Sequence, residues 1–141
     1  MSKNTVTTQW VKDYTFVSTN ESNQSVVLDA SISRDGTKIA PSPMEAVLMA
    51  LSTCAGIDVK LMLTKAKQNF SDIQIKVIGE RREEIPKIYT DIKLHFIVTG
   101  NDLSEKQLAR AIKLSAEKYC SVSHMLQGVV NITHSYEVID P

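Results

Sequence analysis

The chain has 141 residues, 43% of them apolar, which predicts one domain over residues 1–141 with a hydrophobic core. Its 16 basic and 16 acidic residues give a formal net charge of zero, and this balance disfavours nucleic acid and anionic membrane as partners. The first residues, MSKNTVTTQW, lack the apolar core of a signal peptide, and no apolar run approaches the roughly 18 residues that span a bilayer, so we expect a cytoplasmic protein.

The first third of the chain predicts short strands joined by polar turns. Weak strand patterns cover residues 5–14 and 16–19, and the segment SVVLD at residues 25–29 is a third. The Asp35-Gly36 pair in the segment SRDGTK then signals a turn.

A long helix follows, and the sequence SPME marks its start. Ser42 suits the N-cap, Pro43 suits the first helical position, and Glu45 completes a capping box. Apolar side chains then recur at helical spacing to about residue 68. Because residues 44–55 are apolar nearly all round, we expect a buried central helix.

The rest of the chain predicts two strands, two helices and a last strand. Apolar residues alternate with polar ones over residues 73–77 and 92–98. Ser104 opens a helix with a second capping box, S-E-K-Q, and this helix reaches about residue 119. The run SVSHMLQG predicts a short helix closed by Gly128, and residues 130–138 alternate as a strand.

This order of elements predicts an α+β fold with antiparallel sheets wrapping the long central helix. Strands that are adjacent in sequence and joined by short turns favour antiparallel pairing. A helix that is apolar on all sides is hard to bury within 141 residues. We therefore expect a homodimer in which helices from two subunits share one core.

The two cysteines are the residues that suggest chemistry. They are too few for a structural zinc site and lack a Cys-x-x-Cys or His-x-x-x-His companion, so no metal is expected. In a reducing compartment they are either inert core thiols or a redox pair. Cys54 lies on the apolar helix, where a free cysteine is often only a small buried hydrophobe.

Cys120 makes a redox pair more plausible because it falls at a junction between two helices. Ser121 or Ser123 suits the cap of the short helix, which places the thiol near exposed backbone N–H groups. A helix N-terminus stabilises a thiolate and lowers its pKa. The sequence therefore suggests a reactive or resolving sulfur at Cys120.

Two further residues are candidates for a catalytic site. Arg34 lies in the polar loop before the long helix, either as a solvated arginine or as a guanidinium aimed at a thiolate or peroxide. Glu45 is explained by its capping box. Nine positions at roughly 100° each also place it opposite Cys54 on a straight helix, so it would reach a thiol only from another subunit or through a bend.

The other ionisable residues near the cysteines have weaker claims. His124 follows Cys120 by one turn and could act as its base, although a half-exposed helical histidine is the simpler interpretation. Asp58 follows Cys54 by one turn, and its negative charge would raise the pKa of a thiol it faced. We therefore give Asp58 no catalytic role. His95 is expected to face solvent, and His134 to lie on the apolar side of its strand.

Together the two cysteine segments resemble the OsmC/Ohr family, named for osmotically inducible protein C and organic hydroperoxide resistance protein. The matching residues are the S-P-x-E-x-x-L-x-A-L-x-x-C run from Ser42 to Cys54 and the C-x-V-S run from Cys120 to Ser123. The order of strands and helices also fits, so the resemblance covers most of the chain. The P-x-E and C-A-G-I-D-V segments look most like an OsmC-like branch that departs from the typical peroxidase pattern.

The resemblance implies an intertwined homodimer with two active sites at the subunit interface. It also implies reduction of organic hydroperoxides, with Cys54 as the thiolate that attacks the peroxide and Cys120 as the resolving cysteine. Arg34 matches the loop arginine that stabilises the thiolate. The resemblance further implies that no cofactor is bound and that an external dithiol, in some members a lipoylated protein, restores the pair.

The sequence departs from the peroxidase members at two positions. They carry a glutamate directly after the helix-opening proline, where this chain has Met44 and places Glu45 one step on. They also carry a proline after the second cysteine, where this chain has Ser121. Neither departure removes a cysteine.

Two functions of different classes follow. One is an organic hydroperoxide reductase for oxidative stress defence, in which an apolar pocket favours fatty or aryl hydroperoxides. The alternative is an OsmC-like dimeric protein that binds a small ligand or senses redox state without efficient peroxidase turnover. A purely structural stress protein is a third and weaker hypothesis.

Overall fold

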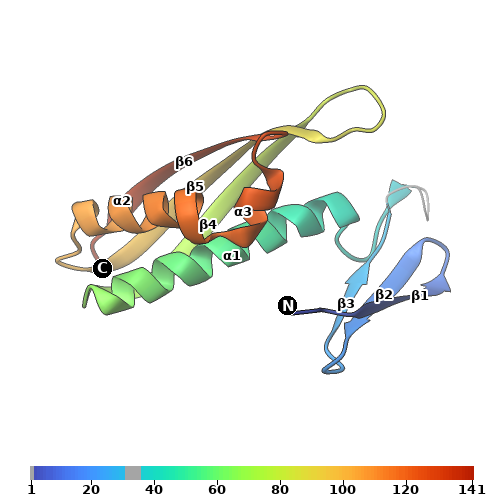
Figure 1. Ribbon diagram of the computed structural model, residues 1–141, viewed down its shortest axis with the longest axis horizontal. Helices are drawn as coiled ribbons and strands as arrows, with labels where there is room; N and C mark the ends of the chain where they lie inside the picture. The colour runs from blue at the N-terminus through green and yellow to red at the C-terminus, as the bar shows by residue number, and fades with distance from the viewer. Residues whose placement is uncertain (1, 31–35) are drawn as a thin grey trace. The chain divides into compact units, whose positions relative to one another are not determined.

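A computed structural model describes residues 2–30 and 36–141 of the chain. The contacts divide the chain into two compact units, residues 1–47 and residues 48–141, and Figure 1 shows the elements of both. The prediction of a single domain over residues 1–141 stays a prediction.

The first unit contains a three-stranded antiparallel sheet in the order β1-β2-β3. Its strands are β1 (Val6–Lys12), β2 (Thr15–Asn20) and β3 (Ser25–Leu28), close to the predicted ranges. Asp13 and Asn23 occupy the two turns with φ values of 51° and 61°, a conformation that Asp and Asn tolerate better than other side chains. All seven residues of β1 are exposed, so this sheet lacks a buried face along its first strand.

A buried aspartate fixes the path of the chain after β3. Asp29 is 2% exposed, and its Oδ1 accepts a hydrogen bond from Thr15 Oγ1 at 3.2 Å. Its Oδ2 accepts from the Ile39 amide at 2.9 Å, and its own amide donates to the Pro41 carbonyl at 3.0 Å. Because a buried carboxylate needs such partners, these bonds hold the end of the loop beside β3, just before the long helix.

Helix α1 (Pro43–Lys65) begins at the predicted capping box. The Glu45 amide donates to Ser42 Oγ at 3.2 Å, and the Ser42 amide donates to Glu45 Oε1 at 3.0 Å. Four side chains spaced one turn apart form the buried strip of the helix: Leu51, Ala55, Val59 and Leu63. Large apolar side chains on other faces are exposed, including Met49, Ile57 and Leu61.

Helix α1 is long and apolar enough to cross a membrane when judged by length and composition alone, with a mean hydropathy of 1.7 over 18 residues. The expectation that no apolar run approaches this length was therefore wrong. Core helices of soluble proteins meet the same criteria, and the prediction of no membrane partner stays a prediction.

The second unit contains a sheet in the order β4-β5-β6. Its strands are β4 (Asn69–Arg81), β5 (Tyr89–Asn101) and β6 (Asn131–Ile139). The first pair is antiparallel, as expected, but β5 and β6 are parallel. The prediction of purely antiparallel sheets was wrong here, because the chain returns through helices after β5 and enters β6 in the same direction.

Those connecting helices are α2 (Glu105–Leu114), the π-helical turn η2 (Ser115–Tyr119) and α3 (Ser121–Leu126). Ser104 caps α2 as predicted, accepting from the Gln107 amide at 3.2 Å. Figure 1 shows α1 and α2 on one face of the second sheet, and the core lies between these layers. Its β5 side consists of Ile92, Leu94, Phe96 and Val98.

Candidate redox site

The turn η2 places Cys120 between two helices. The Cys120 amide donates to the carbonyl oxygen of Ser115, five residues earlier, at 2.8 Å. The residue then caps α3, with its Sγ accepting from the Ser123 amide at 3.4 Å. We predicted that Ser121 or Ser123 would be the cap, but the sulfur takes that position itself. The Cys120 side chain is 0% exposed.

The two cysteines meet within a single chain. Cys54 lies on α1 and is half-buried, Cys120 is buried, and both thiols are free. The side chain of Cys54 lies close enough to Cys120 to raise the pKa of its thiol. The apolar helix and the junction after η2 are far apart in sequence, and the fold brings their two sulfur atoms together.

Burial and neighbouring charge make the Cys120 thiol a weaker acid than an ordinary cysteine. Burial raises the pKa of the Cys120 thiol from 9.0 to about 11, opposed by the hydrogen bond from the Ser123 amide and supported by Cys54 and Asp58. The prediction that a helix N-terminus lowers the pKa of this thiol was therefore wrong. One amide dipole does not offset the removal of the thiolate from water together with two unfavourable neighbours.

Asp58 connects α1 to the segment that carries Cys120. It lies one turn after Cys54, and its Oδ2 accepts a hydrogen bond from Ser115 Oγ at 2.9 Å. The sequence correctly predicts that Asp58 raises the pKa of a nearby thiol, but it gives Asp58 no role in the site. The partner serine lies 57 residues away in sequence, and no local pattern points to it.

Glu45 is engaged in hydrogen bonds and an ion pair at the start of α1. Besides its capping box with Ser42, its Oε1 lies 2.7 Å from the ammonium of Lys38. The bonds from Lys38 and Ser42 lower the pKa of the Glu45 carboxyl to about 2. The other predicted site residue of this region, Arg34, lies outside the described residues.

The histidines take structural positions. The ring of exposed His124 contacts the Glu117 carbonyl oxygen at 2.9 Å and Gln127 at 3.2 Å. His95 pairs with Ser135 at 2.7 Å. His134 stacks on Phe96 with ring centroids 6.5 Å apart, and burial lowers its pKa.

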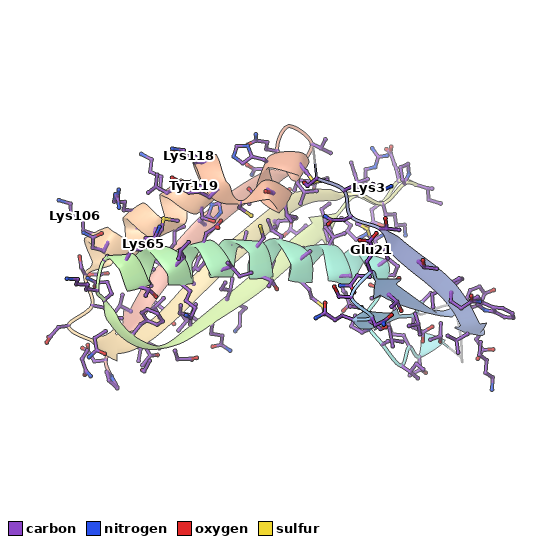
Figure 2. All side chains as sticks on the ribbon, turned by 60° about the horizontal axis from the view of Figure 1, so that its bottom comes forward. Lys3, Glu21, Lys65, Lys106, Lys118 and Tyr119 are labelled. Carbon is purple, nitrogen blue, oxygen red and sulfur yellow. The ribbon has the colours of Figure 1, made fainter. Side chains whose placement is uncertain are left out.

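A cavity of about 530 Å³ has Asp58 in its lining. Figure 2 labels two of its lining residues, Lys65 at the end of α1 and Tyr119 on η2. Its walls combine apolar side chains with charged groups at several points: Asp58, Leu61, Met62, Lys65, Ala66, Gln107, Arg110, Leu114 and Tyr119. Among the described residues, no group of three or more His, Cys, Asp or Glu side chains is placed to hold a metal ion.

Comparison with known proteins shows the family of the chain. The model of the OsmC-like protein family matches residues 35–135, which include both cysteines. The chain belongs to the OsmC-like protein family. Protein YhfA of Escherichia coli K12 is 51% identical over 131 residues, covering 93% of this chain and 95% of YhfA. The resemblance to the OsmC/Ohr family is confirmed, and membership indicates a redox-related role.

Solved structures confirm the α+β fold class. A hypothetical protein from Aquifex aeolicus is 33% identical with a TM-score of 0.88, covering 100% of this chain and 99% of that chain. The organic hydroperoxide resistance protein OhrB of Bacillus subtilis shares the fold at 13% identity, with a TM-score of 0.65, covering 96% of this chain and 98% of that chain.

Proposed function

We propose that this protein is a thiol peroxidase that reduces organic hydroperoxides with the Cys54 and Cys120 pair. The observation that carries the proposal is the meeting of the two free thiols, one half-buried on α1 and one buried at the cap of α3. Two cysteines that serve only as small core hydrophobes need not be neighbours, so their proximity supports a redox pair.

The burial of the two sulfurs supports different roles for them. Cys54 is the more accessible, so its thiolate attacks the outer peroxide oxygen, breaks the O–O bond, and releases an alcohol once the leaving oxygen takes a proton. Cys54 becomes a sulfenic acid. The buried Cys120 thiol then attacks the Cys54 sulfur, forms the S–S bond and displaces the hydroxyl group as water. The net reaction consumes one hydroperoxide and two thiols.

The wider family supports this chemistry. The chain shares the OsmC-like family model and the fold of an organic hydroperoxide resistance protein. We propose that an external dithiol reductant attacks the Cys54–Cys120 disulfide and returns the protein to its dithiol form. A lipoylated protein is the reductant that the family resemblance suggests.

We also propose that the working form is a homodimer. In the single chain α1 exposes Met49, Ile57 and Leu61, each at least half exposed at 50%, 63% and 52%. Large apolar side chains gathered along one helix mark a surface that another subunit covers. A second copy of the chain would also shield the half-buried Cys54 from bulk water.

The test is a single turnover followed by mass spectrometry. One equivalent of cumene hydroperoxide should remove two hydrogen atoms from the wild-type protein and abolish both free thiols, and dithiothreitol should restore them. Cys54→Ser should consume no hydroperoxide, whereas Cys120→Ser should consume one equivalent and retain one oxygen as a sulfenic acid. Unchanged mass and thiol count over hours in the wild type would refute the proposal.

A second candidate function rests on the cavity of about 530 Å³, whose volume suits a small organic molecule. In this alternative the protein binds a ligand or senses redox state without efficient turnover. Native mass spectrometry of the purified protein would then show a co-purifying small molecule. Bare polypeptide together with rapid hydroperoxide consumption would exclude this alternative.

A further inference from the structure

We propose that Asp58 is a positioning residue for the resolving thiol of Cys120, and that it acts through the hydroxyl group of Ser115. The catalytic meaning of this inference rests on the peroxidase function proposed above. The positioning itself is a property of the folded dithiol and is measurable without a peroxide.

Two hydrogen bonds, one to the side chain and one to the backbone of Ser115, connect Asp58 to Cys120. The Asp58 Oδ2 accepts from Ser115 Oγ at 2.9 Å, and the Ser115 carbonyl oxygen accepts from the Cys120 amide at 2.8 Å. Ser115 is 1% exposed, so its hydroxyl has no access to water as a substitute partner. The side chain of Ser115 thus binds α1 while its backbone binds the cysteine.

Helix geometry makes α1 a single support for both halves of the site. Residues four apart lie on the same face of a helix, so Asp58 stands on the side of α1 that carries Cys54. Ser115 is also the first residue of η2. The bond from Ser115 to Asp58 therefore attaches the π-helical turn to the same helix face that presents the attacking sulfur.

The step that depends on this attachment is the closure of the disulfide. The Cys54 sulfenic acid and the Cys120 thiol combine as an S–S bond forms, the S–O bond of the sulfenic acid breaks, and water leaves with the thiol proton. The two sulfurs must approach to roughly 2.05 Å in a narrow range of torsion angles. A misplaced Cys120 would slow this step without changing the attack of Cys54 on the peroxide.

The charge of Asp58 supports the same assignment. The groups whose charges act on Cys120 are Cys54 and Asp58, both from α1, and both raise the pKa of the Cys120 thiol. On its own helix, Cys120 faces the Ser123 amide, and the ring of His124 contacts the Glu117 carbonyl oxygen instead. Burial is the main reason that Cys120 stays protonated, and the charge of Asp58 adds to it while Ser115 holds the residue in place.

Three variants separate the hydrogen bond from the charge. Asp58→Asn removes the charge and keeps a side-chain oxygen that accepts from Ser115. Ser115→Ala keeps the charge and removes the hydrogen bond, and Asp58→Ala removes both. Circular dichroism and thermal unfolding of each variant establish that it is folded before its thiols are measured.

The measurement is the equilibrium constant for disulfide formation against dithiothreitol at pH 7, where the Cys120 thiol is protonated and the charge of Asp58 has little influence on it. We expect Asp58→Ala and Ser115→Ala to lower this constant about tenfold, which is about 30 mV in reduction potential. Asp58→Asn should stay within about twofold of wild type. Equal constants in all four proteins, or a loss in Asp58→Asn as large as in Asp58→Ala, would overturn the assignment.

A kinetic experiment connects the positioning to catalysis. With cumene hydroperoxide and dimedone, Asp58→Ala and Ser115→Ala should accumulate the Cys54 sulfenic acid adduct, whereas wild type and Asp58→Asn should not. If the wild-type protein consumes no hydroperoxide, the peroxidase proposal fails, and the dithiothreitol equilibrium still decides the role of Asp58.

Discussion

Cys120 should be a slow nucleophile whose reactivity keeps rising far above neutral pH. Its pKa of about 11, against an ordinary value of 9.0, lowers the thiolate fraction near pH 8 about 100-fold, because each pKa unit changes that fraction tenfold. Only the thiolate reacts with iodoacetamide. Alkylation of Cys120 in the folded protein should therefore be about 100-fold slower than alkylation of an ordinary thiol, before any steric effect of burial.

The assay is iodoacetamide labelling from about pH 7 to pH 11.5, quenched with acid and resolved by peptide mass spectrometry. The labelling rate of Cys120 should rise tenfold per pH unit up to about pH 11, and the same peptide in guanidinium chloride should level off near pH 9. Asp58→Asn should move the native inflection to lower pH, because it removes a negative charge that disfavours the thiolate. A native inflection at or below pH 9 would refute the reasoning.

Three predictions concern stability. Because the pKa of Cys120 is raised in the folded state, its protonated thiol contributes to the free energy of unfolding below pH 9, and this contribution is lost between about pH 9 and pH 11. Urea midpoints that do not fall over that interval would contradict this prediction. Gly100→Ala should lower the free energy of unfolding by roughly 1–3 kcal/mol, since the added Cβ would overlap the Asn69 carbonyl oxygen, and an unchanged urea midpoint would exclude that overlap. Ser42→Ala should cost about 1 kcal/mol in the same titration by removing the cap that Glu45 completes, and no loss would show that solvent replaces the cap.

The elements that sequence analysis predicted well depend on local physics. The capping boxes at Ser42 and Ser104 involve residues three positions apart, so their hydrogen bonds can be predicted from four consecutive residues. Alternation along 92–98 identified the buried face of β5, because side chains of a strand point to opposite sides in turn. The α+β class followed from the order of these elements.

The features that the sequence did not predict depend on contacts between distant segments. No local sequence pattern predicts that β6 pairs in parallel with β5 or that Ser115 donates a hydrogen bond to Asp58. The pKa of Cys120 was predicted in the wrong direction because the helix terminus, from which the prediction came, is a local feature. The burial of Cys120, which decides the sign, comes from the packing of the whole second unit.

The turn η2 shows why periodicity alone could not build the site. A regular α-helix over residues 104–119 would pair the amide of each residue with the carbonyl four positions back. The Cys120 amide instead reaches Ser115, five positions back, so the turn accommodates an extra residue. One residue turns an α-helix by about 100°, so without this insertion the thiol would point along a different face. The apolar pattern of α2 ends before η2 begins. The pattern therefore cannot indicate the extra residue in η2 that places Cys120 near Cys54.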